Sequence, residues 1–217
     1  KSVGNDPSNR FLITTDENGN NPKVIEELGE NQDKVHVSWS PNNQVVAYAF
    51  TGDAIGLDQQ AIVLVGQNQE NFRNLLVEGR GFVPRWSPSG SSIIYSVWNS
   101  GDGYLPSLWF SRADGDNINA NRLDLNLRTW ADKCAWVNEE TVYCAVPVSL
   151  GDGAGLQREL FDVGPDAIYR INMRNGEKIN LGVPTGNIGV KEISASSDGT
   201  LFLVDQQTGR LIKFDTN

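Results

Sequence analysis

The sequence predicts an all-β protein, a β-propeller of four-stranded antiparallel blades, from three observations. A motif centred on Trp recurs along the chain, turn residues separate strand-length apolar segments, and no stretch keeps a helical period. We expect about four and a half blades in a single domain. The expected ranges are a partial blade at 10–28 and blades at about 35–77, 82–124, 133–181 and 190–215.

The repeated motif is a strand, a tight turn and a second strand. It reads VHVSWSPNN at 35–43 and FVPRWSPSG at 82–90, and it weakens to KCAWVNEE at 133–140 and EISASSDG at 192–199. Trp39, Trp86 and Trp136 are spaced by 47 and 50 residues, and Ala195 holds the fourth position. Pro fixes φ at such a turn, and Gly or Asn accepts a positive φ. The motif therefore predicts strands a and b of each blade.

A second pair of strands follows each motif and completes the blade. One example is 107–112, which contains Trp109 and is followed by the turn residues of 113–115. A single blade cannot bury both faces of its sheet, so neighbouring blades must stack. We expect Trp39, Trp86, Trp136 and Trp109 in the core between blades.

The two ends of the chain predict incomplete blades. Residues 10–28 read as strands c and d, and the last residues, from 201 onward, read as strands b and c. Open blades would expose sheet faces and edges, which is unfavourable. Two alternatives follow: the chain is the C-terminal part of a larger propeller, or it is a closed five-bladed ring whose last blade mixes strands from both ends.

The composition narrows the class of partner. Hydrophobic residues make up 39% of the chain, and 18 basic residues stand against 27 acidic ones, for a net charge of −9. This balance argues against binding nucleic acid through phosphates and against an anionic membrane surface. No apolar segment approaches the roughly 20 residues that span a bilayer. The charge is compatible with a basic protein partner or with cations.

The two cysteines, Cys134 and Cys144, flank one a–b hairpin. A symmetric hairpin centred on Glu139 places them directly opposite each other, within reach of a disulfide bond. Such a bond would imply an oxidising compartment. The alternative is two buried free thiols. Two cysteines and the distant His36 do not make a tetrahedral metal site, so we expect no metal there.

Sequence motifs for catalysis are absent. The chain has no G-x-S-x-G elbow, no P-loop, no HExxH and no GxGxxG followed by a helix. The single histidine, His36, is expected to be an ordinary strand residue. We therefore expect a protein that is not an enzyme.

The b–c connections carry the candidate binding residues. Asp53, Asp102 and Asp152 each follow a Gly, and the b–c and d–a connections of a propeller open on one face. The three Asp residues would form an acidic collar for a cation such as calcium or for a basic peptide, or they are simply turn formers.

The third b–c connection, 147–166, is longer than a blade requires, and long loops are often functional. Its Leu160 and Phe161 would either cap the core or contact a partner. Arg128 and Trp130 precede the same blade in a d–a connection. We expect them to be exposed on that face, where Trp and Arg commonly dominate binding.

The Trp-Ser-Pro motif with its following apolar strand, and the strands that end in Asp-x-x-Gly, resemble the WD40-like repeat of TolB-type bacterial propellers from Arg10 onward. The resemblance implies a propeller of six or seven blades in the periplasm, at the cell surface or outside the cell, acting through protein–protein contact. From the composition and the motifs we expect no cofactor, with calcium at the Asp collar as the alternative, no nucleic acid and no direct insertion into a membrane. The missing blades or a second copy would complete the ring.

We therefore expect a non-enzymatic scaffold that binds a protein through the face of its b–c and d–a connections. Two alternatives stay open because propellers support many functions. The chain is the lid domain of a prolyl-oligopeptidase-like hydrolase, or it binds an ion or small ligand through its Gly-Asp loops.

Overall fold

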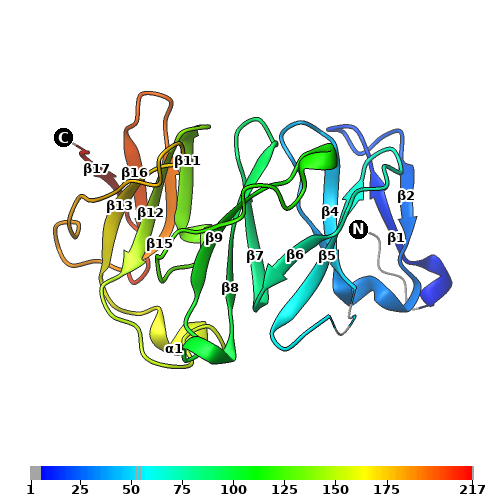
Figure 1. Ribbon diagram of the computed structural model, residues 1–217. Helices are drawn as coiled ribbons and strands as arrows, with labels where there is room; N and C mark the ends of the chain where they lie inside the picture. The colour runs from blue at the N-terminus through cyan, green and yellow to red at the C-terminus, as the bar shows by residue number, and fades with distance from the viewer. Residues whose placement is uncertain (1–5, 52, 54, 217) are drawn as a thin grey trace.

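The computed structural model describes residues 6–51, 53 and 55–216, which form five antiparallel sheets standing side by side in a row (Figure 1). The first sheet pairs β1 (Phe11–Thr14) with β2 (Lys23–Glu27). The second contains β3 (Val35–Val37), β4 (Val45–Phe50), β5 (Gln59–Gly66) and β6 (Leu75–Glu78). The all-β prediction is confirmed, and so is the prediction of four-stranded antiparallel blades.

The remaining sheets follow in chain order. The third contains β7 (Arg80–Trp86), β8 (Ser92–Trp98), β9 (Ser107–Arg112) and β10 (Leu123–Asp124). The fourth contains β11 (Cys134–Asn138), β12 (Thr141–Pro147), β13 (Asp166–Asn172) and β14 (Lys178–Asn180). The fifth has three strands, β15 (Val190–Ala195), β16 (Leu201–Asp205) and β17 (Leu211–Phe214). In each sheet the strands pair in sequence order. They occupy positions a, b, c and d in the three four-stranded sheets, and positions a, b and c in the fifth sheet.

Helical segments are short and lie in the connections. The one α-helix of the described chain is α1 (Arg158–Phe161), and 3₁₀ turns form at 7–9, 29–34, 100–102, 115–117 and 131–133. A helix able to cross a membrane was not found among the described residues.

The Ser-Pro turn closes the a–b hairpins through its serine. Ser40 is fully buried, and its Oγ accepts a hydrogen bond from the backbone N–H of Val45 at 2.9 Å. Ser87 repeats this contact with the N–H of Ser92 at 3.3 Å. Both turns end on a residue with positive φ, Asn43 at 59° and Gly90 at 70°, which an Asn or Gly accepts most easily. The motif thus fixes the hairpin from within.

Apolar side chains fill the seam between the second and third sheets. Strands b, c and d of one sheet pack against strands a and b of the next, through Val45, Ile62, Leu64, Leu75 and Val77 on one side and Phe82, Ile93, Tyr95 and Val97 on the other. Trp86 and Trp109 are half-buried against this core. The indole N–H of Trp86 donates to Ser38 Oγ in the preceding sheet at 3.0 Å. Trp136 is half-buried against the equivalent core of the next seam.

Trp39 does not occupy a buried core position, contrary to the prediction. Its side chain is 45% exposed, and its indole N–H donates to Asn43 Oδ1 of its own turn at 2.6 Å. The physical reason lies in the first sheet, whose β1 and β2 hold positions c and d only. They pack against Val35, Val46 and Ala47. Trp86, in contrast, bonds Ser38 just after strand a of the preceding sheet, and the first sheet has no described strand a to offer Trp39 the same contact. A cavity of about 490 Å³ also remains between β2 and strands β4 and β5.

A closed five-bladed ring, one of the two alternatives above, is wrong for this structure. The first and fifth sheets lie at opposite ends of the row, blue and red in Figure 1. Within the described residues β1 and β2 pair only with each other, and β17 pairs only with β16. The terminal strands therefore do not mix into a shared blade.

Candidate protein-binding face

Three b–c connections, at 51–58, 99–106 and 148–165, gather at one end of the sheets. Figure 1 shows α1 and the turn that follows β8 at this end, at the bottom of the view. Gly52 and Ala54 of the first connection lie outside the described residues. We call the surface made by these connections and the adjoining d–a connections the loop face.

The first and second connections are joined by a carboxylate. Asp58 Oδ2 accepts hydrogen bonds from the backbone N–H of Ser100 at 2.8 Å and from the Ser100 hydroxyl. These two bonds lower the pKa of the Asp58 carboxyl from its usual value, the side-chain bond having the larger effect. Asp58 thus stays ionised and ties the two connections together.

The second and third connections are joined by their backbones. The N–H of Gly153 donates to the carbonyl of Gly103, and the N–H of Gly155 donates to the carbonyl of Tyr104, both at 2.7 Å. Glycine is favoured at both positions, by space at Gly155 and by the backbone conformation at Gly103. A Cβ on Gly155 would lie 2.5 Å from Cβ of Trp98, and one on Gly103, at φ 72°, would lie 2.7 Å from an Asp152 oxygen. The repeated Gly-Asp-Gly sequence therefore serves contact between loops.

The three predicted collar residues do not form a common site. Asp102 Oδ2 pairs with Arg128 at 2.5 Å and accepts from Ser107 Oγ at 3.2 Å. Asp53 and Asp152 are exposed. In the described part of the chain, no group of three or more His, Cys, Asp or Glu residues could hold a metal ion. Arg128, the ionic partner of Asp102, is partly exposed at the loop face.

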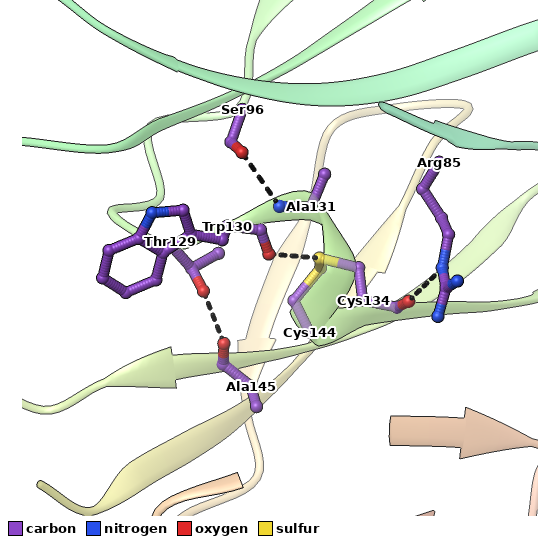
Figure 2. The surroundings of a disulfide bond; sticks show 8 residues. All are labelled: Arg85, Ser96, Thr129, Trp130, Ala131, Cys134, Cys144 and Ala145. Carbon is purple, nitrogen blue, oxygen red and sulfur yellow. Dashed lines mark hydrogen bonds between the residues drawn. A yellow bond between two sulfur atoms is a disulfide. The ribbon is translucent and has the colours of Figure 1, made fainter. Parts of the chain in front are cut away.

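Trp130 is not exposed on the loop face, contrary to the prediction. Only 4% of its surface is accessible to solvent. The residues directly before and after it are hydrogen-bonded to strands of two different sheets, β12 and β8. Thr129 Oγ1 donates to the carbonyl of Ala145 at 2.6 Å, and the N–H of Ala131 donates to Ser96 Oγ at 3.2 Å. Figure 2 shows these two hydrogen bonds on either side of Trp130, close to the disulfide bond.

A buried ionic cluster lies behind the third connection. Lys133 is fully buried, and its Nζ donates to Asp162 Oδ1 at 2.5 Å and to both carboxylate oxygens of Asp166 at 2.8 Å. Asp166 Oδ2 also accepts from the N–H of Val190 at 2.6 Å. Burial raises the pKa of the Asp166 carboxyl, while Lys133 opposes that rise. The cluster links the third connection to both the fourth and the fifth sheet.

Arg158 of α1 extends the same cluster to the surface. Its Nε bonds Asp162 at 3.0 Å, its Nη1 bonds Asp132 at 2.6 Å, and its guanidinium lies 4.6 Å from the centre of the Trp130 ring. The sequence reasoning missed this cluster. The available indications were the i,i+4 spacing of Arg158 and Asp162 and the Asp132-Lys133 pair beside the strand that begins at Cys134.

The predicted disulfide bond is confirmed. Cys134 and Cys144 are paired residues of β11 and β12 with Cα atoms 4.0 Å apart, and their sulfur atoms are bonded (Figure 2). Both residues are fully buried in the seam between the third and fourth sheets. The predicted register therefore holds, although a bulge near Asn138 makes the turn itself asymmetric.

Apolar side chains project from the loop face. Leu57 is 88% exposed and Leu160 is 67% exposed, and Tyr104, Leu156 and Val163 are exposed as well. Phe161 behaves differently: it is half-buried and its ring packs against Gly151. The loop face thus combines apolar side chains with loops that are hydrogen-bonded to one another.

His36 lies away from these connections, in β3. Its ring stacks on Tyr48 with centroids 5.1 Å apart and meets Phe50 edge to face at 5.3 Å. It is thus one member of an aromatic group on the second sheet.

Comparison with known proteins supports the fold and leaves the family open. No family model matches the chain, and no curated protein matches its sequence. Solved structures do match. TolB from Acinetobacter baumannii aligns at a TM-score of 0.55 and 15% identity over 96% of this chain and 50% of its own. An oligogalacturonate lyase in complex with manganese gives 0.57 and 15%, over 94% and 52% of the two chains.

The tricorn protease matches at a TM-score of 0.54 and 13% identity, over 97% of this chain and 23% of its own. The chain therefore spans about half the length of the TolB and lyase structures and less than a quarter of the protease. Identities this low show a shared β-propeller fold and nothing about activity.

Proposed function

We propose that this chain is a non-enzymatic β-propeller scaffold that binds a protein partner through the loop face, in the cell envelope or outside the cell. One observation carries the proposal: large apolar side chains stand in solvent on loops that are already ordered. Leu57 and Leu160 belong to the first and third connections, which Asp58, Gly153 and Gly155 join through the second. Exposed apolar patches commonly mark protein-binding surfaces.

Order in the unbound loops favours binding. Loops that are held in place lose little conformational freedom when a partner docks, so more of the contact energy appears as affinity. The hydrogen bonds that Ser100 donates to Asp58 and that Gly153 donates to Gly103 hold the loops in place, and neither bond involves Leu57 or Leu160. The apolar side chains are therefore free to contact a partner.

The disulfide bond supports the proposed location. Buried disulfides persist in oxidising compartments and are rare in the reducing cytosol. Cys134 and Cys144 are both inaccessible, and the bond lies within one hairpin. This supports the periplasm, the cell surface or the extracellular space. The fold is also shared with domains of peptidases and a lyase, but the exposed loops point to binding rather than to a reaction.

The test compares arginine substitutions at two exposed leucines. Leu160→Arg changes the loop face, and Leu123→Arg changes the start of β10, beside the c–d turn at the other end of the sheets, where the side chain is 47% exposed. Proteins captured from an extract of the native host by the wild-type chain would be identified and their affinity measured by calorimetry. We expect Leu160→Arg to weaken binding at least tenfold and Leu123→Arg to leave it unchanged. Equal binding by both variants would contradict the proposal.

A further inference from the structure

The b–c connections of the second, third and fourth sheets carry much of the negative charge of the protein. They contain six acidic residues and one basic residue, a net charge of −5, within a chain whose total is −9. The acidic residues are Asp53, Asp58, Asp102, Asp152, Glu159 and Asp162, and the basic one is Arg158. A surface that is apolar and negative at once restricts the chemistry of its partner.

Three cations beside the second and third of these connections are already paired within the protein. Arg158 bonds Asp132 and Asp162, Arg128 bonds Asp102, and Lys133 is buried between Asp162 and Asp166. To reach any of these three cations, a partner carboxylate would have to displace an existing ion pair.

Two carboxylates of the third connection differ from these paired cations. Asp152 and Glu159 are exposed, and neither forms a salt bridge with any described residue. They lie in the same connection as the apolar side chains of Leu156 and Leu160, and Glu159 directly precedes Leu160. Apolar contacts and unpaired negative charge are thus presented by one short segment.

We infer that the partner presents a basic amphipathic helix, with apolar residues that contact Leu57, Leu156 and Leu160 and with Lys or Arg residues that face Asp152 and Glu159. The inference rests on the proposed function and adds the chemistry of the partner. A helix fits because it displays apolar residues on one side and cations along its flanks. Opposite charge across the contact accelerates association and excludes acidic competitors.

The probes are two synthetic amphipathic peptides of equal length and identical apolar pattern, one with lysine and one with glutamate at the polar positions. Calorimetry at about 50 mM and about 500 mM salt measures each affinity, because salt screens exposed charges strongly over this range. We expect the Leu/Lys peptide to bind the wild-type chain and to lose at least tenfold in affinity at high salt. The Leu/Glu peptide should not bind.

Paired substitutions locate the effect. Asp152→Asn with Glu159→Gln should weaken the Leu/Lys peptide about three- to tenfold, the range expected for two exposed ion pairs. Asp116→Asn with Glu177→Gln removes the same charge from the c–d turns at the other end of the sheets and should change nothing. Comparable binding of both peptides, or equal effects of the two double variants, would overturn the inference.

The experiment separates this inference from the proposed function. If Leu160→Arg abolishes capture of the native partner while Asp152→Asn with Glu159→Gln leaves its affinity unchanged, the loop face binds a partner of different chemistry and only the inference fails. If neither variant alters binding of the native partner, the proposed function fails as well.

Discussion

The second and fourth sheets are packed in a way opposite to the strength of their sequence motifs. The turn at Trp39 carries the full Trp-Ser-Pro sequence, yet it borders a two-stranded sheet and leaves Trp39 45% exposed. The fourth sheet has lost Ser-Pro after Trp136, yet it has all four strands, a disulfide bond and the buried Lys133 cluster. The motif therefore reports where a hairpin forms, and the neighbouring sheet decides how firmly it is packed.

The largest effect should come from the buried lysine. Lys133→Met leaves Asp166 buried without a cation and Asp162 paired only with Arg158, and we expect the free energy of unfolding to fall by about 3–5 kcal/mol. Lys191→Met, at an exposed position of β15, should change it by less than about 0.5 kcal/mol. Urea denaturation measures both. Equal losses would show that the cluster does not hold the fourth and fifth sheets together.

Removal of the disulfide bond should have the next largest effect. The bond closes a loop of ten residues, and its loss in the Cys134→Ala, Cys144→Ala variant should lower the free energy of unfolding by about 2–3 kcal/mol. Urea denaturation of both proteins with and without a reductant provides the control. Reductant should destabilise only the wild-type protein, and a wild-type protein unaffected after full reduction would contradict the expectation.

The two motif tryptophans allow the comparison to be made directly. Trp136→Ala removes a half-buried side chain from a complete seam and should cost about 2 kcal/mol. Trp39→Ala removes a side chain from an open seam and should cost less than about 1 kcal/mol. Thermal denaturation of the two variants measures the difference. A Trp39 variant as unstable as the Trp136 variant would mean that the first seam is packed as tightly as the others.

The smallest effect concerns Tyr95 in the aromatic seam. Its ring is fully buried, its hydroxyl has no hydrogen-bond partner among the described residues, and burial raises its pKa above the usual value near 10. The unfolded chain therefore ionises first, and the stability present below pH 10 declines as the pH rises further. Tyr95→Phe should raise the free energy of unfolding by about 1 kcal/mol at pH 7, and it should reduce the fall in that free energy above pH 10. Urea denaturation between pH 7 and 11 tests both; an unchanged decline would contradict the assignment.

Much of the fold could be predicted because each blade repeats the same local chemistry. Ser40, Ser87 and the positive-φ residues that follow them fix their hairpins within a few residues, so the sequence alone locates them. The pairing of Cys134 with Cys144 was predictable for the same reason, because hairpin register depends on local spacing.

The exposure of individual side chains could not be predicted in this way. Trp130 was expected to be exposed and is buried, whereas Trp39 was expected to be buried and is exposed. The burial of each depends on contacts with a neighbouring sheet, which the local sequence does not describe. The cluster of Lys133 with Asp162 and Asp166 joins residues about 30 positions apart, and no motif marks that contact. The long third connection was recognised as unusual from its length, but its bonds to the second connection depend on three-dimensional closeness.

Hydroxyl-radical labelling of the free protein, read residue by residue by mass spectrometry, tests the stacked-sheet account most directly because indole rings react according to their exposure. The account predicts rapid oxidation of Trp39 and of Leu57 and Leu160 on the loop face, with slow oxidation of Trp86, Trp130 and Trp136. Oxidation of Trp86 and Trp136 as fast as that of Trp39 would contradict the stacking of the sheets.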